Sequence, residues 1–230
     1  MKALLLAAGL GTRLRPLTER VPKCLVPIRG RPLLDYWLEL LLPHGVERIL
    51  INCSYLAEQV HAHVAASPWR AHIDLIDETS LLGTGGTIRA NRAYFSDQPF
   101  LVAHADNLSR FPLAAFIDRH RNRPAGCDMT MMTFDCEDPS SCGIVEQDRS
   151  GVVRGFHEKV ANPPGRCANG AVYIFEPAVA DFICGLGQDM IDLSTEILPT
   201  YVGRIATWHN DDYHRDIGTP DSLSKAERDY

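Results

Sequence analysis

The first half of the chain alternates short apolar runs with segments of helical periodicity, and this alternation limits the folds open to it. Strands separated by helices in this way form a mostly parallel sheet with helices on its faces. We therefore expect a three-layer α/β/α, Rossmann-like fold, in which ligands bind at the carboxyl ends of the strands. Predicted strands cover residues 2–8, 48–53, 72–77 and 99–106, and predicted helices cover residues 31–45, 56–66 and 85–95.

From about residue 127 the alternation of strands and helices gives way to a series of short strand-like segments. Strand-like pieces are separated by turn residues, which predicts a small antiparallel extension of the same domain. These pieces cover residues 127–134, 143–148, 151–159 and 170–175. A helix over 192–202, a strand over 204–209 and a C-terminal helix beginning at Thr219 are expected to follow.

Length and composition narrow the class of protein. The 230 residues can bury one sizeable core, so a single domain over residues 1–230 is expected. The formal net charge of −6 argues against nucleic acid as a partner, because nucleic-acid-binding proteins carry a basic surplus. The opening apolar run of about seven residues is too short for a secretory signal or a membrane span. Seven cysteines without a Cys-x-x-Cys pair favour free thiols. A cytoplasmic protein with no membrane partner is expected.

A loop rich in glycine and basic residues follows the first predicted strand. Gly9 and Gly11 let the backbone approach a ligand closely, and successive exposed amides form an anion-binding concavity. Arg13, Arg15 and Lys23 add positive charge within the same stretch. The loop therefore predicts a polyphosphate ligand at the end of this strand.

Two familiar phosphate-binding loops do not fit this stretch. A dinucleotide fingerprint needs a third glycine where Leu14 stands, and a P-loop needs a Gly-Lys-Ser/Thr run that is absent. A surface loop with solvated cations is the remaining alternative. The regular mixture of Gly, Arg, Pro and Lys disfavours it.

Seven motifs occur in order along the chain: LAAGLGTRLRPLTERVPKCLVPI, LGTGGTI, VAHADN, FHEK, NGAVYIF, DLSTEILP and HRDIGTP. Together they resemble the signature of the sugar-1-phosphate nucleotidylyltransferases, and the resemblance covers essentially the whole chain. It implies one nucleotidyltransferase domain, in which residues 1–126 mainly bind the nucleotide and residues 127–230 mainly bind the sugar phosphate. It also implies a reaction in which a sugar 1-phosphate attacks the α-phosphorus of a nucleoside triphosphate and releases pyrophosphate.

Within that family, GTGGTI, AHADN and FHEKV most resemble the GDP-forming branch that uses D-glycero-α-D-manno-heptose 1-phosphate for surface polysaccharides. GTP and this sugar phosphate are the partners that the resemblance implies. Three alternatives stay open. They are mannose 1-phosphate with GTP, glucose or muramic 1-phosphates with UTP or dTTP, and a non-catalytic nucleotide-sugar sensor.

The resemblance implies Mg²⁺ as the cofactor, held by Asp106 and Asp216. Two anions must be brought together in the reaction, which favours a divalent cation, and carboxylate oxygens suit Mg²⁺. Relatives usually have glycine before the first aspartate, where Ala105 stands here. A turn or capping role is the alternative for each aspartate.

Arg13 and Lys23 are the catalytic residues that the resemblance implies. Arg13 would hold the β- and γ-phosphates, and Lys23 would neutralise the α-phosphate during transfer. Arg15 is equally well explained as a surface cation. The implied nucleotide-binding residues are Leu6, Ala8, Gly9, Gly11, Thr12, Arg13, Gly83, Thr84, Gly85 and Gly86, and the last four would line the base site.

A second set of residues is implied for the sugar phosphate. Glu158 would accept hydrogen bonds from sugar hydroxyls, and Lys159 would contact the sugar phosphate. Relatives often have proline after this lysine, where Val160 stands here. Asp192 is equally well explained as a helix N-cap before Thr195. The full set is Asn107, Gly143, Glu158, Lys159, Asn169, Gly170 and Asp192.

The nine histidines show no spacing typical of a metal site. His61 and His63 are two residues apart, which does not place them on one helical face. No His-Glu-x-x-His or Cys/His cluster occurs in the sequence. We interpret the histidines as structural or solvated, including His104. A homodimer is compatible with the sequence.

Overall fold

The computed structural model describes all 230 residues, which divide into two compact units. The first unit comprises Met1–Leu81, Ala103–Phe111 and Asp212–Tyr230, and the second comprises Leu82–Val102 and Pro112–Asp211. Each unit is assembled from separate stretches of sequence, and the functional division at residue 126 stays a prediction. The predicted α/β class, with a mostly parallel Rossmann-like sheet and an antiparallel extension, is confirmed.

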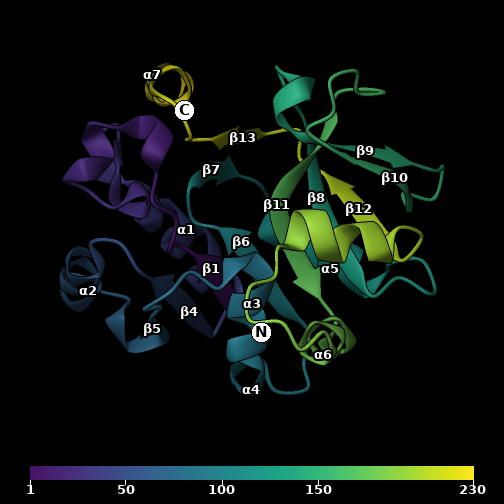
Figure 1. Cartoon of the computed structure of the whole chain (residues 1–230), viewed down its shortest axis with the longest axis horizontal. Coiled ribbons are helices and arrows are strands. Elements are labelled where there is room, and N and C mark those ends of the chain that lie inside the picture. Colours follow the sequence, from purple (N-terminus) through teal and green to yellow (C-terminus); the bar gives the residue numbers. More distant parts are fainter. The chain divides into compact units, whose positions relative to one another are not determined.

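Parallel strands form the sheet of the first unit (Figure 1). The strands over residues 2–6 and 48–53 have largely buried side chains, which explains why their sequences are nearly continuous apolar runs. The strand over residues 73–77 alternates apolar and acidic residues and is only partly buried. Cys53 lies opposite Asp77 in the register, and the amide of Ala105 donates to the carbonyl of Leu6 at 3.0 Å. The carboxyl ends of neighbouring strands therefore lie at one edge. The strands are β1 (Lys2–Leu6), β4 (Arg48–Cys53) and β5 (Ile73–Asp77), and β6 (Phe100–His104) enters the unit with its last two residues.

Two short antiparallel ribbons in the first unit were not predicted. The first pairs β7 (Asn107–Arg110) with β13 (Tyr213–Asp216), and the second pairs β2 (Pro27–Ile28) with β3 (Arg31–Pro32). In the first ribbon, Asp216 lies opposite Asn107. This register brings the C-terminal part of the chain beside the residues that follow β6.

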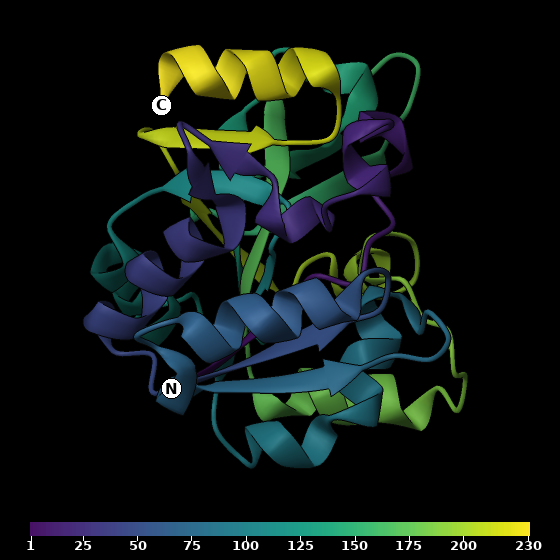
Figure 2. The same cartoon turned by 90° about the vertical axis from the view of Figure 1, so that its left-hand side faces the viewer.

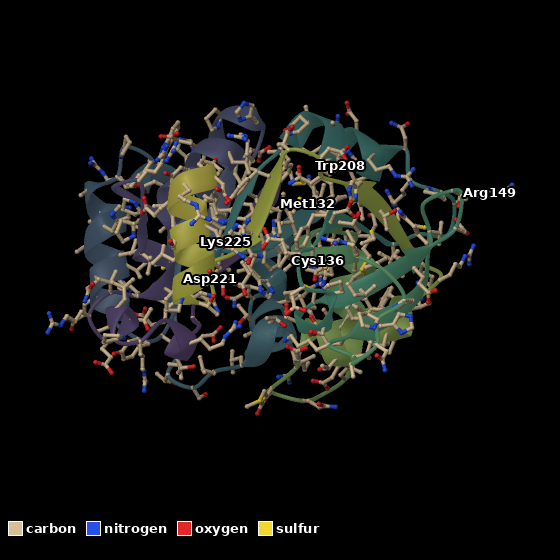
Figure 3. All side chains as sticks on the ribbon, turned by 90° about the horizontal axis from the view of Figure 1, so that it is seen from above. Met132, Cys136, Arg149, Trp208, Asp221 and Lys225 are labelled. Carbon is tan, nitrogen blue, oxygen red and sulfur yellow. The ribbon has the colours of Figure 1, made fainter.

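The helices of the first unit are α1 (Leu33–Leu41), α2 (Ala57–Ala66) and α7 (Pro220–Asp229). Gly45, with a φ of 105°, ends the turn after α1, as predicted. Thr219 and Ser222 form a capping box at the start of α7. Figure 2 shows α7 along β13 and α2 against β5. Asp221 and Lys225 form an ion pair at 3.1 Å on α7 (Figure 3).

The sheet of the second unit is mixed. β12 runs parallel to β8, whereas β8 and β11, β11 and β9, and β9 and β10 are antiparallel. The register of β11 shifts between Asn169 and Tyr173, which marks a bulge. Arg149, in the turn between β9 and β10, extends into solvent (Figure 3). The strands are β8 (Met129–Asp135), β9 (Gly143–Gln147), β10 (Val153–Glu158), β11 (Cys167–Phe175) and β12 (Ile205–His209).

The helices of the second unit differ from the prediction in four places. The helix expected over 85–95 is divided at Asn91, whose side chain donates to the carbonyl of Thr87 at 2.8 Å. The helix expected over 192–202 is a π-helical turn, Leu193–Ile197, followed by a 3-10 turn, Leu198–Tyr201. Two further helices were not predicted. The α-helices are α3 (Gly83–Ala90), α4 (Arg92–Phe95), α5 (Leu113–Arg121) and α6 (Pro177–Gly185). No helix of the chain combines the length and hydropathy that a bilayer span requires.

Candidate functional site

Buried polar side chains anchor the start of the loop that follows β1. The amide of Ala7 donates to Asn52 Oδ1 at 2.7 Å, and Asn52 Nδ2 donates to Glu78 Oε1 at 3.0 Å. The side chains of Asn52 and Glu78 are almost fully buried. Neither residue was predicted from the sequence. A polar Asn inside the apolar run of β4 is a signal that could have identified the first, because buried polar groups need partners.

Gly11 fixes the turn of this loop. Its φ of 62° lies in the left-handed region, and a Cβ there would come within 2.9 Å of the Thr18 methyl group. The Thr18 hydroxyl donates to the carbonyl of Gly11 at 2.7 Å. The amides of Gly9, Leu10 and Thr12 donate no hydrogen bond within the protein. These amides are therefore free to face an anion.

Lys23, Asp106 and Asp216 lie together, although three separate stretches of sequence supply them. Lys23 Nζ donates to Asp106 Oδ2 at 2.6 Å and to Asp216 Oδ1 at 3.2 Å. Lys23 begins a 3-10 turn, Asp106 follows β6, and Asp216 ends β13. The amide of Ile217 donates to the carbonyl of Asp106 at 3.1 Å, which holds the last two segments side by side.

Arg13 lies at the exposed edge of this cluster. Its guanidinium is 3.5 Å from Asp216 Oδ2, and 67% of its side chain is exposed, against 7% for Lys23. Gly218 leaves room for this contact, because a Cβ there would lie 2.6 Å from the Asp216 carboxylate and 2.9 Å from the guanidinium. Arg13 is therefore accessible to a ligand, whereas Lys23 is held against its carboxylates.

The electrostatics of the cluster keep Asp106 ionised. Burial acts to raise the pKa of Asp106, but the charge of Lys23, together with His104 and the hydrogen bond from Lys23, lowers it below its ordinary value. Asp106 is therefore an anion at neutral pH. Two carboxylates that share one ammonium group offer hard oxygen donors to a single cation, which is the donor chemistry that Mg²⁺ prefers. Asp106 and Asp216 thus fit a divalent metal ion.

The remaining residues predicted for ligand contacts in the first unit are dispersed around the loop. Leu6 ends β1, and Ala8 is buried in the loop itself. Asn107 is buried at the start of β7, and its carbonyl accepts a hydrogen bond from Trp37 Nε1 at 2.8 Å. Arg15 is exposed and has no ion-pair partner. The ligand contacts of these residues stay predictions.

In the second unit, the GTGG motif begins α3 and packs on the segment around Ile191. The amides of Gly85 and Gly86 donate to the carbonyl of Ile191 at 2.8 and 3.3 Å. Gly83 has a φ of 74°, and a Cβ there would lie 2.5 Å from the same carbonyl. Packing therefore requires these glycines. The amides of Gly85 and Gly86 already donate hydrogen bonds within the protein. A contact with the base, as predicted, would therefore involve other backbone groups of the motif.

Thr84 links this motif to Asp192. The amide of Leu193 donates to Thr84 Oγ1 at 2.7 Å, and Thr84 Oγ1 lies 3.5 Å from Asp192 Oδ2. Asp192 Oδ1 accepts a hydrogen bond from the amide of Thr195 at 2.9 Å. The alternative of an N-cap at Asp192 is confirmed, and its sugar contact stays a prediction.

Gly143 and Glu158 come together where β9 begins and β10 ends, and Lys159 directly follows β10. Gly143 lies opposite Glu158, and a Cβ on Gly143 would come within 2.6 Å of Glu158 Oε2. Lys159 Nζ is 3.2 Å from Glu158 Oε1, and its side chain is 66% exposed. Only glycine at position 143 leaves the Glu158 carboxylate where it is.

Asn169 and Gly170 lie at the bulge of β11. Asn169 Nδ2 donates to the Tyr173 hydroxyl at 2.7 Å, and Asn169 Oδ1 accepts from the amide of Ala171 at 2.9 Å. Burial raises the pKa of Tyr173, so its hydroxyl stays protonated. The bulge thus fixes the amide side chain of Asn169, and the sugar contact of both residues stays a prediction.

No cysteine near the loop has the character of a nucleophile. Burial raises the pKa of Cys24 and of Cys53 to about 12, so both remain thiols at neutral pH. Burial also lowers the pKa of His214 to about 3, and this neutral ring pairs with Ser109 Oγ at 2.7 Å. The functional groups of the first unit are therefore the loop amides, two cations and two carboxylates.

Several known proteins resemble this chain in sequence. The model of the family described as Nucleotidyl transferase matches residues 2–230. A UTP–glucose-1-phosphate uridylyltransferase from Synechocystis sp. is 34% identical over 218 residues, which cover 88% of this chain and 55% of that protein. A mannose-1-phosphate guanylyltransferase from Mycobacterium tuberculosis is 32% identical over 232 residues, which cover 99% of this chain and 64% of that protein. The chain thus spans less than two thirds of the length of either relative.

A solved structure is similar over nearly its full length. HddC from Yersinia pseudotuberculosis, solved in complex with GMP-PN, matches with a TM-score of 0.82 and 28% identity, over 98% of this chain and 97% of that chain. The family model and the structural match both cover almost every residue, and they agree with the seven sequence motifs. This chain belongs to the nucleotidyl transferase family.

Proposed function

We propose that this chain is a nucleotidylyltransferase that joins GTP and D-glycero-α-D-manno-heptose 1-phosphate, giving the GDP-sugar and pyrophosphate for capsule, lipopolysaccharide or S-layer synthesis in the cytoplasm. The observation that carries the proposal is the cluster of Lys23 with Asp106 and Asp216. It lies in the same unit as the loop amides and as Arg13, which is 3.5 Å from Asp216. Cations, carboxylates and unpaired amides together suit a metal-bound triphosphate.

The reaction is a phosphoryl-type substitution. An oxygen of the sugar 1-phosphate forms a bond to the α-phosphorus, and the bond from that phosphorus to the pyrophosphate oxygen breaks. The attacking oxygen is already anionic at neutral pH, so no activated Ser, Cys or His is needed. Catalysis then depends on alignment and on neutralisation of charge.

The residues of the first unit have distinct roles in this proposal. The amides of Gly9, Gly11 and Thr12 bind phosphate oxygens, and the accessible guanidinium of Arg13 holds the β- and γ-phosphates through its fork of donors. Lys23 donates to the α-phosphate, exchanging contacts that it makes with carboxylates in the free protein. Asn52 and Glu78 position the loop through the amide of Ala7.

Members of this family generally use divalent metal ions, and we propose Mg²⁺ here. Asp106 and Asp216 would hold the ion, and it would neutralise negative charge on the phosphates. The ionised state of Asp106 supports this assignment, since a metal ligand must be deprotonated.

The second unit supplies the proposed sugar residues. Glu158 accepts hydrogen bonds from sugar hydroxyls, and the exposed ammonium of Lys159 binds the sugar phosphate. Asn169, fixed by Tyr173, presents a polar side chain from β11. Gly143, Gly170 and Asp192 complete the residues proposed from this unit, and Asn107 is the one member of the set that belongs to the first unit.

The relatives differ in the nucleotide and the sugar phosphate that their names indicate. The M. tuberculosis relative carries the name mannose-1-phosphate guanylyltransferase, and HddC was solved with GMP-PN, which favours a guanine nucleotide. Mannose 1-phosphate with GTP is therefore the second candidate. The Synechocystis relative carries the name of a UTP-using enzyme, which keeps UTP in the test. The sensor alternative is disfavoured because Arg13, Lys23, Asp106 and Asp216 are all present.

A matrix of triphosphates against sugar phosphates tests the proposal. The protein is incubated with Mg²⁺, with GTP, UTP or dTTP, and with heptose, mannose, glucose or muramic 1-phosphate, and pyrophosphate release is measured. We expect the largest kcat/KM for GTP with the manno-heptose phosphate. A larger value for mannose 1-phosphate would establish the second candidate. No pyrophosphate from any pair would reject catalysis and support the sensor.

A further inference from the structure

We propose that Cys53, His61 and Asp77 form a second metal site, for a borderline divalent cation of the Zn²⁺ type. One potential ligand atom from each residue lies within 4.8 Å of the other two, and His61 Nε2 is 2.8 Å from Asp77 Oδ1. None of these residues belongs to the sets proposed for the nucleotide, the sugar or Mg²⁺. The proposal therefore goes beyond the transferase function.

The fold of the first unit builds this cluster from three neighbouring elements. Cys53 and Asp77 lie opposite each other at the carboxyl ends of the parallel strands β4 and β5. Residues opposite each other in a parallel pair point to the same face of the sheet. Helix α2 follows β4, packs against β5 and carries His61 (Figure 2). The strand register and the packing of α2 thus bring the three side chains together.

The donor set indicates which cation would bind. A thiolate, an imidazole and a carboxylate are ligands that Zn²⁺ accepts in tetrahedral sites, whereas Mg²⁺ prefers oxygen donors alone. Cys53 is a thiol in the metal-free protein, so binding of the cation would have to release its proton to solvent. Bonds of about 2.0–2.3 Å place tetrahedral ligand atoms roughly 3.3–3.7 Å apart. Side-chain rotation of His61 and Asp77 can supply the difference, because both side chains are about half exposed. Their exposure also leaves a fourth position open to water.

The position of the cluster gives the metal a structural role. Cys53 follows Asn52 and Asp77 precedes Glu78, and this buried pair holds the amide of Ala7. A cation that joins the ends of β4 and β5 would stiffen the support of the phosphate-binding loop. Without a metal, His61 and Asp77 would be an ordinary surface pair, and Cys53 a small buried side chain.

Cobalt absorption tests the site directly. Metal-free, reduced protein is titrated with Co²⁺, and the thiolate-to-cobalt charge-transfer band is followed in the near ultraviolet. We expect one equivalent of Co²⁺ to produce the band and Zn²⁺ to abolish it. His61→Gln and Asp77→Asn should each weaken Co²⁺ binding at least tenfold, and Cys53→Ser should remove the band.

Matched variants separate this site from the others. His44→Gln and Cys184→Ser alter an exposed histidine and a half-buried thiol elsewhere, and both should bind Co²⁺ as the wild type does. Asp106→Asn should also keep the band, which separates this result from failure of the transferase proposal. Circular dichroism checks that each variant is folded. If Cys53→Ser does not fold, the variants His61→Gln and Asp77→Asn alone test the proposed metal site. Absence of the band, or a band unchanged in His61→Gln and Asp77→Asn, would overturn the proposal.

Discussion

The two units hold their proposed site residues in different ways. In the first unit, Lys23, Asp106 and Asp216 come from distant stretches and are held by direct contacts between opposite charges. In the second unit, Glu158 is positioned by the strand opposite it, where Gly143 leaves room for its carboxylate. The first arrangement depends on charge and the second on backbone shape. Substitutions in the two units should therefore have different effects on catalysis, substrate binding and stability.

The largest effect is expected from Asp106→Asn in the first unit. Removing the charge of this proposed metal ligand should lower kcat about 10³-fold, because stabilisation of charge in the transition state is lost. The fold should persist, since Lys23 keeps its contact with Asp216. Pyrophosphate release and thermal unfolding measure the two quantities. Activity within a few fold of the wild type would remove Asp106 from the metal site.

A smaller and more selective effect is expected from Glu158→Gln in the second unit. Loss of a charged acceptor should raise KM for the sugar 1-phosphate about 10- to 100-fold, while KM for GTP changes little. Glu146→Gln is the matched control, because Glu146 is exposed on the neighbouring strand β9 and pairs with His157. Equal changes in KM for both substrates would argue against a sugar role for Glu158.

Backbone shape in the second unit is tested by Gly83→Ala. The positive φ and the Ile191 carbonyl 2.5 Å from the added Cβ should together lower the free energy of unfolding by about 2–3 kcal/mol. Gly187→Ala is the control, since Gly187 also has a positive φ but no atom within 4 Å of a Cβ. It should cost about 1 kcal/mol. Urea unfolding measures both, and equal losses would show that the contact with Ile191 does not constrain Gly83.

An effect confined to acid pH concerns a buried histidine of the second unit. Burial, and then the charge of Arg123, lowers the pKa of His120 to about 4, and its Nδ1 lies 2.9 Å from Thr130 Oγ1. An unfolded histidine titrates near 6.5, so between these values only the unfolded chain binds the proton. This histidine therefore makes stability fall with falling pH, by about 1.4 kcal/mol per pH unit.

The variant His120→Gln removes that proton uptake. Its free energy of unfolding should fall less steeply than that of the wild type between about pH 6.5 and pH 4. Urea unfolding at several pH values in this window measures the two slopes. Parallel slopes would contradict a buried neutral imidazole.

Local patterns predicted the elements that position the loop, but not the contacts that complete the site. The apolar runs of β1, β4 and β5 and the helix before Gly45 were predictable, because each depends on nearby residues. The ribbon of β7 with β13 was not, because its short, polar strands show no alternation and pair across a long stretch of chain. Asp216 therefore could be named from the family resemblance, whereas its contact with Lys23 could not.

Other differences arise from tertiary packing that spacing does not encode. The family resemblance implied that the GTGG motif lines the base site, but two of its amides donate hydrogen bonds to the carbonyl of Ile191, a residue far along the chain. His61 was interpreted as solvated or structural because its sequence neighbours offered no ligand spacing. Strand pairing and helix packing bring it to Cys53 and Asp77. Helices α5 and α6, in contrast, carry apolar residues at helical spacing and were simply missed.

The central claim is that Asp106 and Asp216, gathered by Lys23, hold the metal of a bound triphosphate. A crystal structure with a non-hydrolysable GTP analogue and Mn²⁺ tests it most directly, because anomalous scattering locates the metal. We predict a manganese peak bound by both carboxylates, with the triphosphate on the loop from Gly9 to Arg13. A triphosphate and a metal peak that lie away from both aspartates would contradict it.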